Sequence, residues 1–290
     1  HGRIHRLACG AQGAVGVESE RLMAPTPATH PLAPTGNLPQ RLLDLLFPPR
    51  CVHCGRMGEP LCAVCRASIQ APRSPRCVRC DRSLNGAPGP RCGLCVALAS
   101  QGRQIALGRI IVAADYGDAT RSAIRALKFR RQRRLAQPLG LLLVEAIQRV
   151  GAPPADLIDL IIPMPLQADR KRERGYNQAA LLARTVARAL RLPLRDDALT
   201  RVRATRPQTL LHRDARRANV AGAFALSGST AERALADHRI LLIDDVTTTG
   251  ATLEAAAEAL LAAQPAAIYA AAVARPLRDL WPAGAEPPDR

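Results

Sequence analysis

Four Cys-x-x-Cys pairs, spread over residues 51–95, limit what this part of the 290-residue chain can fold into. The block around them is rich in Pro, Gly and Arg, so its own side chains cannot form an ordinary core. Two residues between cysteines let both sulfurs bind one metal ion, and eight thiolates suffice for two tetrahedral zinc sites with four cysteines each. The pairs are Cys51/Cys54, Cys62/Cys65, Cys77/Cys80 and Cys92/Cys95.

Two structural zinc ions are therefore the predicted cofactors of this block, with every coordination position filled by protein. Disulfides would need an oxidising compartment, and residues 1–22 lack the apolar segment of a secretory signal. A redox dithiol normally occurs once, not four times in a row. We expect sequential pairing, in which the first two pairs share one ion and the last two share the other. Interleaved pairing is the alternative. The cysteine pairs are the only internal repeat that we recognise.

From about residue 109 the chain alternates between apolar strands and amphipathic helices. Nearly continuous apolar strands separated by helices indicate a parallel sheet covered on both faces, which is the α/β class. Strands are predicted at 109–115, 156–166, 222–227, 239–246 and 266–274, and helices at 119–148, 177–190 and after 250.

Composition divides the chain into four parts. A Pro-rich polar stretch follows Met23, and residues 1–22 are expected to lie outside the fold. No run of 18 or more apolar residues occurs, so membrane insertion is not expected. The predicted parts are a disordered arm at 1–40, a Cys-rich zinc module at 41–100, an α/β domain at 105–276 and a tail at 277–290.

The segment ILLIDDVTTTGAT, residues 240–252, predicts a site for a phosphorylated sugar. A buried strand would carry Asp244 and Asp245 to its carboxyl end, where their carboxylates can accept hydrogen bonds from ribose hydroxyls. Small hydroxylated residues and one glycine then let backbone N–H groups surround a phosphate at the start of a helix. The residues of this cradle are Val246, Thr247, Thr248, Thr249, Gly250, Ala251 and Thr252.

Three other interpretations of this segment are weaker. A magnesium-binding strand of a P-loop NTPase would require a Gly-Lys-Ser/Thr cradle, and neither lysine of the chain follows a glycine. A dinucleotide fold would require G-x-G-x-x-G after a strand, and no such string occurs. A merely well-capped helix would leave two adjacent aspartates at a buried strand end without a purpose.

The segment also resembles the phosphoribosyl pyrophosphate (PRPP) binding motif of type I phosphoribosyltransferases. Taken with the Cys pairs and the segments at 161–183 and 199–224, it is similar to the ComF family of competence-associated proteins. The similarity covers about residues 41–276, with Tyr176 where the family more often has Phe. It implies a type I phosphoribosyltransferase fold, a parallel sheet flanked by helices, preceded by a double zinc ribbon. It also implies PRPP binding with Mg²⁺ and a cytoplasmic role in taking up single-stranded DNA during natural transformation.

The resemblance implies roles for further residues. Asp244 and Asp245, next to the sugar, are the expected catalytic residues. The basic loop after the strand at 156–166 would hold pyrophosphate, with Arg174 and Gly175 matching the family block. An Arg-rich insertion at 199–217 resembles the flexible loop that closes over PRPP, and its arginines could equally bind a DNA backbone. The residues expected at nucleic acid or in the flexible loop are Lys128, Arg203, Arg213, Arg216 and Arg217.

Three functions compete at this stage. The first is an active phosphoribosyltransferase whose acceptor no residue identifies. The second is a DNA-handling protein that binds a phosphoribosyl ligand, which the formal net charge of +17 favours. The third is a zinc-ribbon scaffold that docks a partner such as a competence helicase. We expect a combination in which the fold is that of a transferase and the role is DNA uptake.

Overall fold

The computed structural model describes residues 44–73, 75–84, 86–101, 105–150, 157–203 and 219–276. The described elements all belong to the unit that begins at Asp44. The predictions for the arm at 1–40, for the tail at 277–290 and for Arg213, Arg216 and Arg217 fall outside the described residues.

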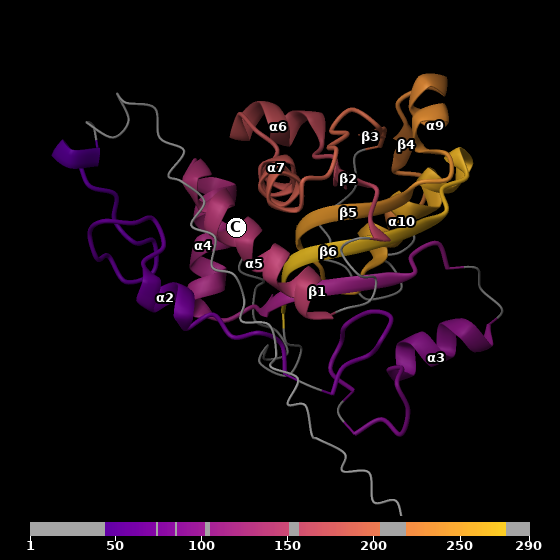
Figure 1. The fold of residues 1–290 in the computed structure, drawn as a ribbon, viewed down its shortest axis with the longest axis horizontal. Helices are drawn as coiled ribbons and strands as arrows, with labels where there is room; N and C mark the ends of the chain where they lie inside the picture. The colour runs from indigo at the N-terminus through magenta and orange to yellow at the C-terminus, as the bar shows by residue number, and fades with distance from the viewer. Residues whose placement is uncertain are drawn as a thin grey trace, which may run out of the picture. The chain divides into compact units, whose positions relative to one another are not determined.

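A parallel sheet of four strands forms the centre of the α/β domain (Figure 1). Its strands follow the order β1-β6-β5-β2, and each neighbouring pair is parallel, which confirms the predicted fold class. The strands are β1 Arg109–Asp115, β2 Leu160–Pro163, β5 Arg239–Val246 and β6 Ala267–Arg275.

The strand expected at 222–227 lies elsewhere. Its described part, β4 Phe224–Leu226, pairs antiparallel with β3 Leu199–Arg201 in a separate two-stranded sheet. Only Phe224 of β4 is fully buried, whereas the central strands β5 and β6 are buried on both faces. An apolar stretch of three residues is too short to distinguish these two environments from sequence.

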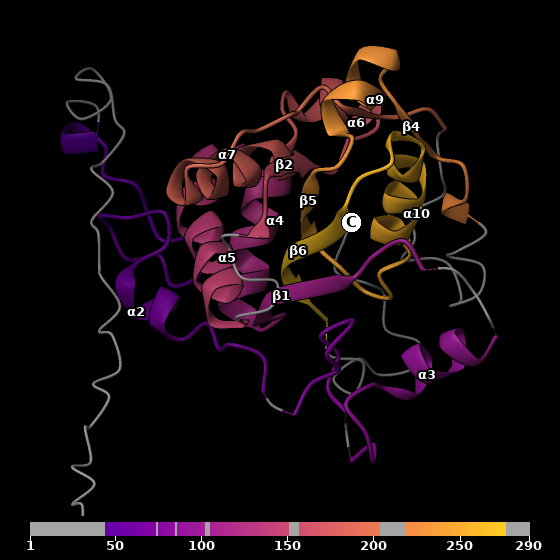
Figure 2. The ribbon, with the colours of Figure 1, turned by 45° about the vertical axis from the view of Figure 1, so that its right-hand side comes forward.

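Helices cover both faces of the parallel sheet (Figure 2). One face packs against α4, α5 and α7, and the other packs against α10. The predicted helix at 119–148 is divided by a turn in which Arg131 has a φ of 53°. These elements are α4 Asp118–Phe129, η1 Arg133–Leu135, α5 Ala136–Val150, α7 Gln178–Leu190, α10 Ala251–Leu260 and η4 Leu261–Ala263.

Shorter helices complete the described chain. Two of them follow cysteines of the Cys-rich block, and two lie on either side of β3 and β4 in the sequence. They are α2 Ala63–Ala67, α3 Gly93–Ser100, α6 Ala168–Arg174 and α9 Ser229–Leu235. Within the described residues, no helix combines the length and apolar character needed to span a bilayer.

Two hydrophobic cores lie on opposite faces of the sheet because neighbouring residues of a strand point in opposite directions. Leu241 and Ile243 of β5 belong to the core beneath α4, α5 and α7, and Ile240 and Leu242 belong to the core beneath α10. The cysteines divide in the same way. Cys51, Cys62 and Cys65 join the first core, and Cys77, Cys80, Cys92 and Cys95 join the second.

Candidate functional site

The two aspartates lie near the carboxyl end of strand β5, at the carboxyl end of the sheet. Asp245 is buried, Asp244 is half-buried, and the Asp245 amide donates to Oδ1 of Asp244 over 2.8 Å. The backbone then turns through residues 247–252, which we call the phosphate loop, into helix α10. The Thr247 amide donates to the Ala274 carbonyl of β6 over 3.0 Å, so the start of the loop is fixed to the sheet.

Gly250 is the position at which the phosphate loop requires glycine. Its φ of 85° lies in the left-handed region, which L side chains rarely adopt. A Cβ atom there would lie 2.8 Å from Cδ1 of Ile110 in β1. The loop therefore packs directly against β1, and the side-chain hydroxyl of Thr249 accepts from the Ala251 amide over 3.3 Å where α10 begins.

Burial and mutual repulsion act on the two carboxylates. Burial raises the pKa of Asp244 above its ordinary value, and the neighbouring Asp245 carboxylate raises it further. The Lys128 ammonium opposes this rise, since its Nζ lies 3.3 Å from Oδ2 of Asp245 in a nearly buried ion pair. The sequence placed Lys128 among the expected nucleic-acid contacts, and the structure places it at the carboxylates.

The predicted pyrophosphate residues lie at the end of α6. Gly175 ends this helix with a φ of 80°, and its carbonyl accepts from Nη2 of Arg133 over 3.2 Å. The Arg174 guanidinium lies 5.2 Å from the centre of the Phe129 ring and hydrogen-bonds Gln178. Burial lowers the pKa of Arg174, and the charge of Asp245 acts against this shift. Arg174 therefore lies close enough to the carboxylate pair to interact with it electrostatically.

Arg203 has a different role from Lys128. Its Nη2 donates to the carbonyls of Asn219 and Ala221, over 3.1 and 2.6 Å. These bonds join the two ends of the segment at 204–218, whose own residues lie outside the described part of the chain. The sequence assigns Arg203 to DNA or to the flexible loop, and its described contacts are with the base of that loop.

The eight cysteines form the two groups of the sequential pairing. Cys51, Cys54, Cys62 and Cys65 make one group, and the remaining four make the other, with the sulfurs of each group within 4.8 Å of one another. Burial opposes ionisation of the Cys51 thiol, but backbone amides of Cys54, Cys62 and His53 outweigh it and lower its pKa to about 6. Four converging thiols with amides aimed at the sulfur suit a structural zinc ion in each group.

The first pair of each group lies in a repeated turn that the sequence analysis did not identify. Knuckle 1 (residues 50–57) and knuckle 2 (residues 76–83) both begin with the pattern R-C-V-x-C-x-R. Their ends are joined by equivalent bridges, between Arg50 and Met57 and between Arg76 and Ser83. Aligning the cysteine pairs with their flanking residues would have revealed this repeat.

Comparisons with known proteins agree with this architecture. The model of the double zinc ribbon domain matches residues 42–99, and the model of the phosphoribosyl transferase domain matches residues 176–284. DNA utilization protein YhgH of Escherichia coli K12 is 34% identical over 170 residues, which cover 58% of this chain and 73% of that protein. For YhgH of E. coli O157:H7 the match covers 53% of this chain and 66% of the relative.

Relatives with the name competence protein match as well. Competence protein F of Haemophilus influenzae is 31% identical over 209 residues, which represent 70% of this chain and 87% of that protein. Competence protein ComFC of Bacillus subtilis is 35% identical over 102 residues, or 35% of this chain and 38% of the relative.

Serine substitution can test the zinc pairing directly. The whole chain should carry two zinc ions by elemental analysis, and replacing Cys51, Cys54, Cys62 and Cys65 together should leave one. Interleaved pairing would instead leave none, because both sites would lose ligands. The matched control is Cys9→Ser, which removes a thiol outside the four pairs and should leave two ions bound.

Proposed function

The chain belongs to the ComF family, and on this premise we propose that it binds the ribose 5-phosphate part of PRPP and handles single-stranded DNA during its uptake. The observation that carries the first part is the phosphate loop, which joins the two aspartates at the end of β5 to the start of α10 and packs against β1 at Gly250. The names of its relatives, DNA utilization protein and competence protein, support the second part. Such a role would be cytoplasmic, with a competence helicase as the class of protein partner.

The 5-phosphate would bind in the phosphate loop. Backbone N–H groups at the beginning of α10 point out of the helix, where they attract an anion. Gly250 keeps the loop close to β1 and leaves no side chain at its tightest point. Thr248, Thr249 and Thr252 are partly exposed there, and their hydroxyls are suited to phosphate oxygens.

The ribose hydroxyls would bind Asp244 and Asp245, and the pyrophosphate would approach Lys128 and Arg174. Carboxylate oxygens suit hydroxyl donors, and the guanidinium group of Arg174 suits phosphate oxygens. A Mg²⁺ ion arriving with PRPP would fit this oxygen-rich position and neutralise part of the pyrophosphate charge. The charges of the site thus match a ligand that has hydroxyls in its middle and phosphates at both ends.

DNA would bind the exposed basic residues next to this site. Arg130 and Arg131 follow α4, and Arg170 and Lys171 lie on α6, all exposed to solvent. Tyr176 is unsuited to base stacking because it is buried, its hydroxyl bonds the Leu127 carbonyl, and Arg133 lies over its ring. Affinity would then come mainly from phosphate contacts, without a preference for sequence.

The second candidate is an active phosphoribosyltransferase with a small-molecule acceptor. The same loop and aspartates favour it, because an enzyme of this fold must also hold PRPP before it transfers the phosphoribosyl group. Release of pyrophosphate from PRPP in the presence of purines, pyrimidines or amines would separate turnover from binding alone.

Removing the aspartates should remove PRPP binding. We expect Asp244→Asn/Asp245→Asn to weaken binding of PRPP with Mg²⁺ by about tenfold to a hundredfold, as for the loss of charge-assisted hydrogen bonds. Calorimetry measures this change. Asp196→Asn, which removes an exposed carboxylate paired with Arg184, is the matched control and should leave the affinity unchanged. Equal affinity in wild type and the double variant would contradict the proposed site.

Binding of PRPP should release a proton from Asp244. Its raised pKa means that the free protein keeps this proton to a higher pH than an ordinary aspartate would. Ribose hydroxyls and Mg²⁺ favour the carboxylate, so affinity should rise with pH and protons should leave on binding. Calorimetry in two buffers of different ionisation enthalpy, between about pH 5 and 9, counts them. Proton release that persists unchanged in Asp244→Asn would exclude this residue as the source.

Single-stranded DNA binding should depend on salt and on the exposed arginines. Arg130→Gln/Arg131→Gln should reduce the slope of log K against log salt, by about 0.7 for each DNA phosphate that these arginines no longer neutralise. Fluorescence anisotropy with labelled oligonucleotides measures the slope. Arg188→Gln/Arg233→Gln removes the same charge from exposed positions on α7 and α9. If both double variants lower the slope equally, the effect comes from net charge and not from this surface.

A further inference from the structure

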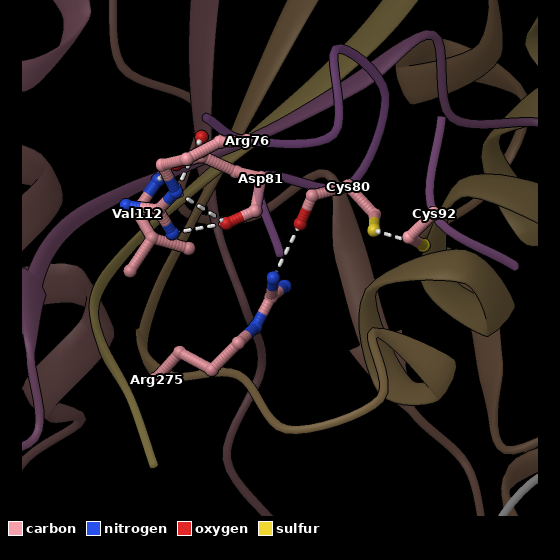
Figure 3. Close-up of polar contacts among 6 residues, drawn as sticks. All are labelled: Arg76, Cys80, Asp81, Cys92, Val112 and Arg275. Carbon is pink, nitrogen blue, oxygen red and sulfur yellow. Dashed lines mark hydrogen bonds and ion pairs between the residues drawn. The ribbon is translucent and has the colours of Figure 1, made fainter. Parts of the chain in front are cut away.

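Knuckle 2 occupies the outer edge of β1. This strand ends the order of the parallel sheet, and backbone N–H groups on its outer side need partners from elsewhere. The Ile110 amide donates to the Arg79 carbonyl over 2.7 Å, and the Val112 amide donates to Oδ2 of Asp81 over 2.6 Å. Figure 3 shows the Asp81 carboxylate directed at Val112 and Arg76. Knuckle 2 thus takes the place of a neighbouring strand.

The two residues that make these contacts distinguish knuckle 2 from knuckle 1. Asp81 has a φ of 59°, and the equivalent residue of knuckle 1 is Gly55, with a φ of 76°. Glycine is the residue that adopts this conformation without strain, so an aspartate there needs compensation. Its bond to Val112 and its ion pair with Nε of Arg76, at 3.3 Å, supply that compensation.

Arg79, which occupies the position of His53 in knuckle 1, contacts the helix α10 that follows the phosphate loop. Its Nη2 lies 3.2 Å from Oε2 of Glu254 in a mostly buried ion pair, and its Nη1 lies 3.6 Å from the Cys95 sulfur. Glu254 lies in the first turn of α10, directly after the loop. The other Glu254 oxygen accepts from the Ala106 amide over 2.7 Å, so one carboxylate joins knuckle 2, α10 and the segment before β1.

The contacts of knuckle 2 therefore surround the phosphate loop. Ile110, whose amide is held by Arg79, is also the residue whose side chain abuts Gly250. Arg82 Nη2 lies 3.4 Å from the Thr248 carbonyl within the loop itself. Cys80 is fixed as well, because the buried Arg275 at the end of β6 donates to its carbonyl (Figure 3).

We propose that knuckle 2 positions the phosphate loop, with Arg79, Asp81 and Arg82 as positioning residues that hold β1 and the start of α10 in the geometry that accepts a 5-phosphate. The identity of the ligand rests on the proposed function, whereas the claim that knuckle 2 holds the loop in place does not. Knuckle 1 makes contacts of another kind. His53 lies 3.4 Å from the Ser122 hydroxyl, in an exposed contact with α4. Outside knuckle 1, Arg66 of α2 pairs with Glu145 of α5 over 2.7 Å, also in an exposed contact.

Substitution of Arg79 in the full chain tests the proposal, with His53→Gln as the matched control at the equivalent position of knuckle 1. Hydrogen exchange of peptides covering residues 246–254 reports how firmly the loop is held, and calorimetry with ribose 5-phosphate reports its fitness for the ligand. Arg79→Gln should increase loop exchange several-fold and weaken ribose 5-phosphate binding by about tenfold. His53→Gln should change neither, and Arg79→Lys should restore part of both.

A measurement of zinc content and a second variant distinguish loss of loop positioning from loss of a metal ion. Glu254→Gln removes the same ion pair from the side of α10, where the side chain contacts Arg79 and not a cysteine. It should increase loop exchange while both zinc ions stay bound, even if Arg79→Gln loses a metal. Unchanged loop exchange in Glu254→Gln would overturn the proposal. If wild type fails to bind ribose 5-phosphate, the proposed function is wrong, and the exchange measurements still decide whether knuckle 2 positions the loop.

Discussion

The unpaired backbone edge of β1 is the constraint on which the rest of the arrangement depends. A four-stranded parallel sheet leaves N–H groups on its outer strand, and burying them unpaired would cost about 1–3 kcal/mol for each group. Knuckle 2 supplies the partners for Ile110 and Val112. The Cys-rich block in turn has too few apolar residues to form a core of its own. Each part therefore provides what the other lacks: metal-binding turns cover the edge of the sheet, and the sheet buries the cysteines of the second group.

The carboxylate pair at the carboxyl end of β5 is a second constraint on the sheet. Two adjacent aspartates at a buried strand end lose hydration and also repel each other, which is why the pKa of Asp244 is raised. Lys128 compensates part of that cost through its ion pair with Asp245. A ligand that brings hydroxyl donors and a divalent cation would compensate more of it. Carboxylates with a raised pKa at the end of a buried strand are typical of functional sites.

Local sequence patterns predicted the helices and strands of this fold, but they could not predict contacts between residues far apart in the sequence. Cysteine spacing indicated two groups of four cysteines, and apolar runs indicated the strands of the sheet. The ion pair of Lys128 with Asp245 joins residues far apart in sequence, and no pattern around Lys128 distinguishes it from the arginines nearby. The same holds for Arg79 and Glu254. The strand β4 was predicted, but its expected place in the parallel sheet was wrong. Three apolar residues do not specify a partner strand, and pairing is decided by what the rest of the chain leaves exposed.

The two knuckles show how one metal-binding turn can serve two purposes. Both position backbone amides and two cysteines in the same way, so zinc chemistry sets the residues that they share. The residue directly before the second cysteine and the residue directly after it are free of that demand. In knuckle 1 these are His53 and Gly55, which leave the turn with an exposed contact to α4. In knuckle 2 they are Arg79, which binds Glu254 of α10, and Asp81, which binds the Val112 amide of β1. Two substitutions in a repeated turn thus separate a knuckle with one exposed contact from a knuckle that is bonded to β1 and to the helix that follows the phosphate loop.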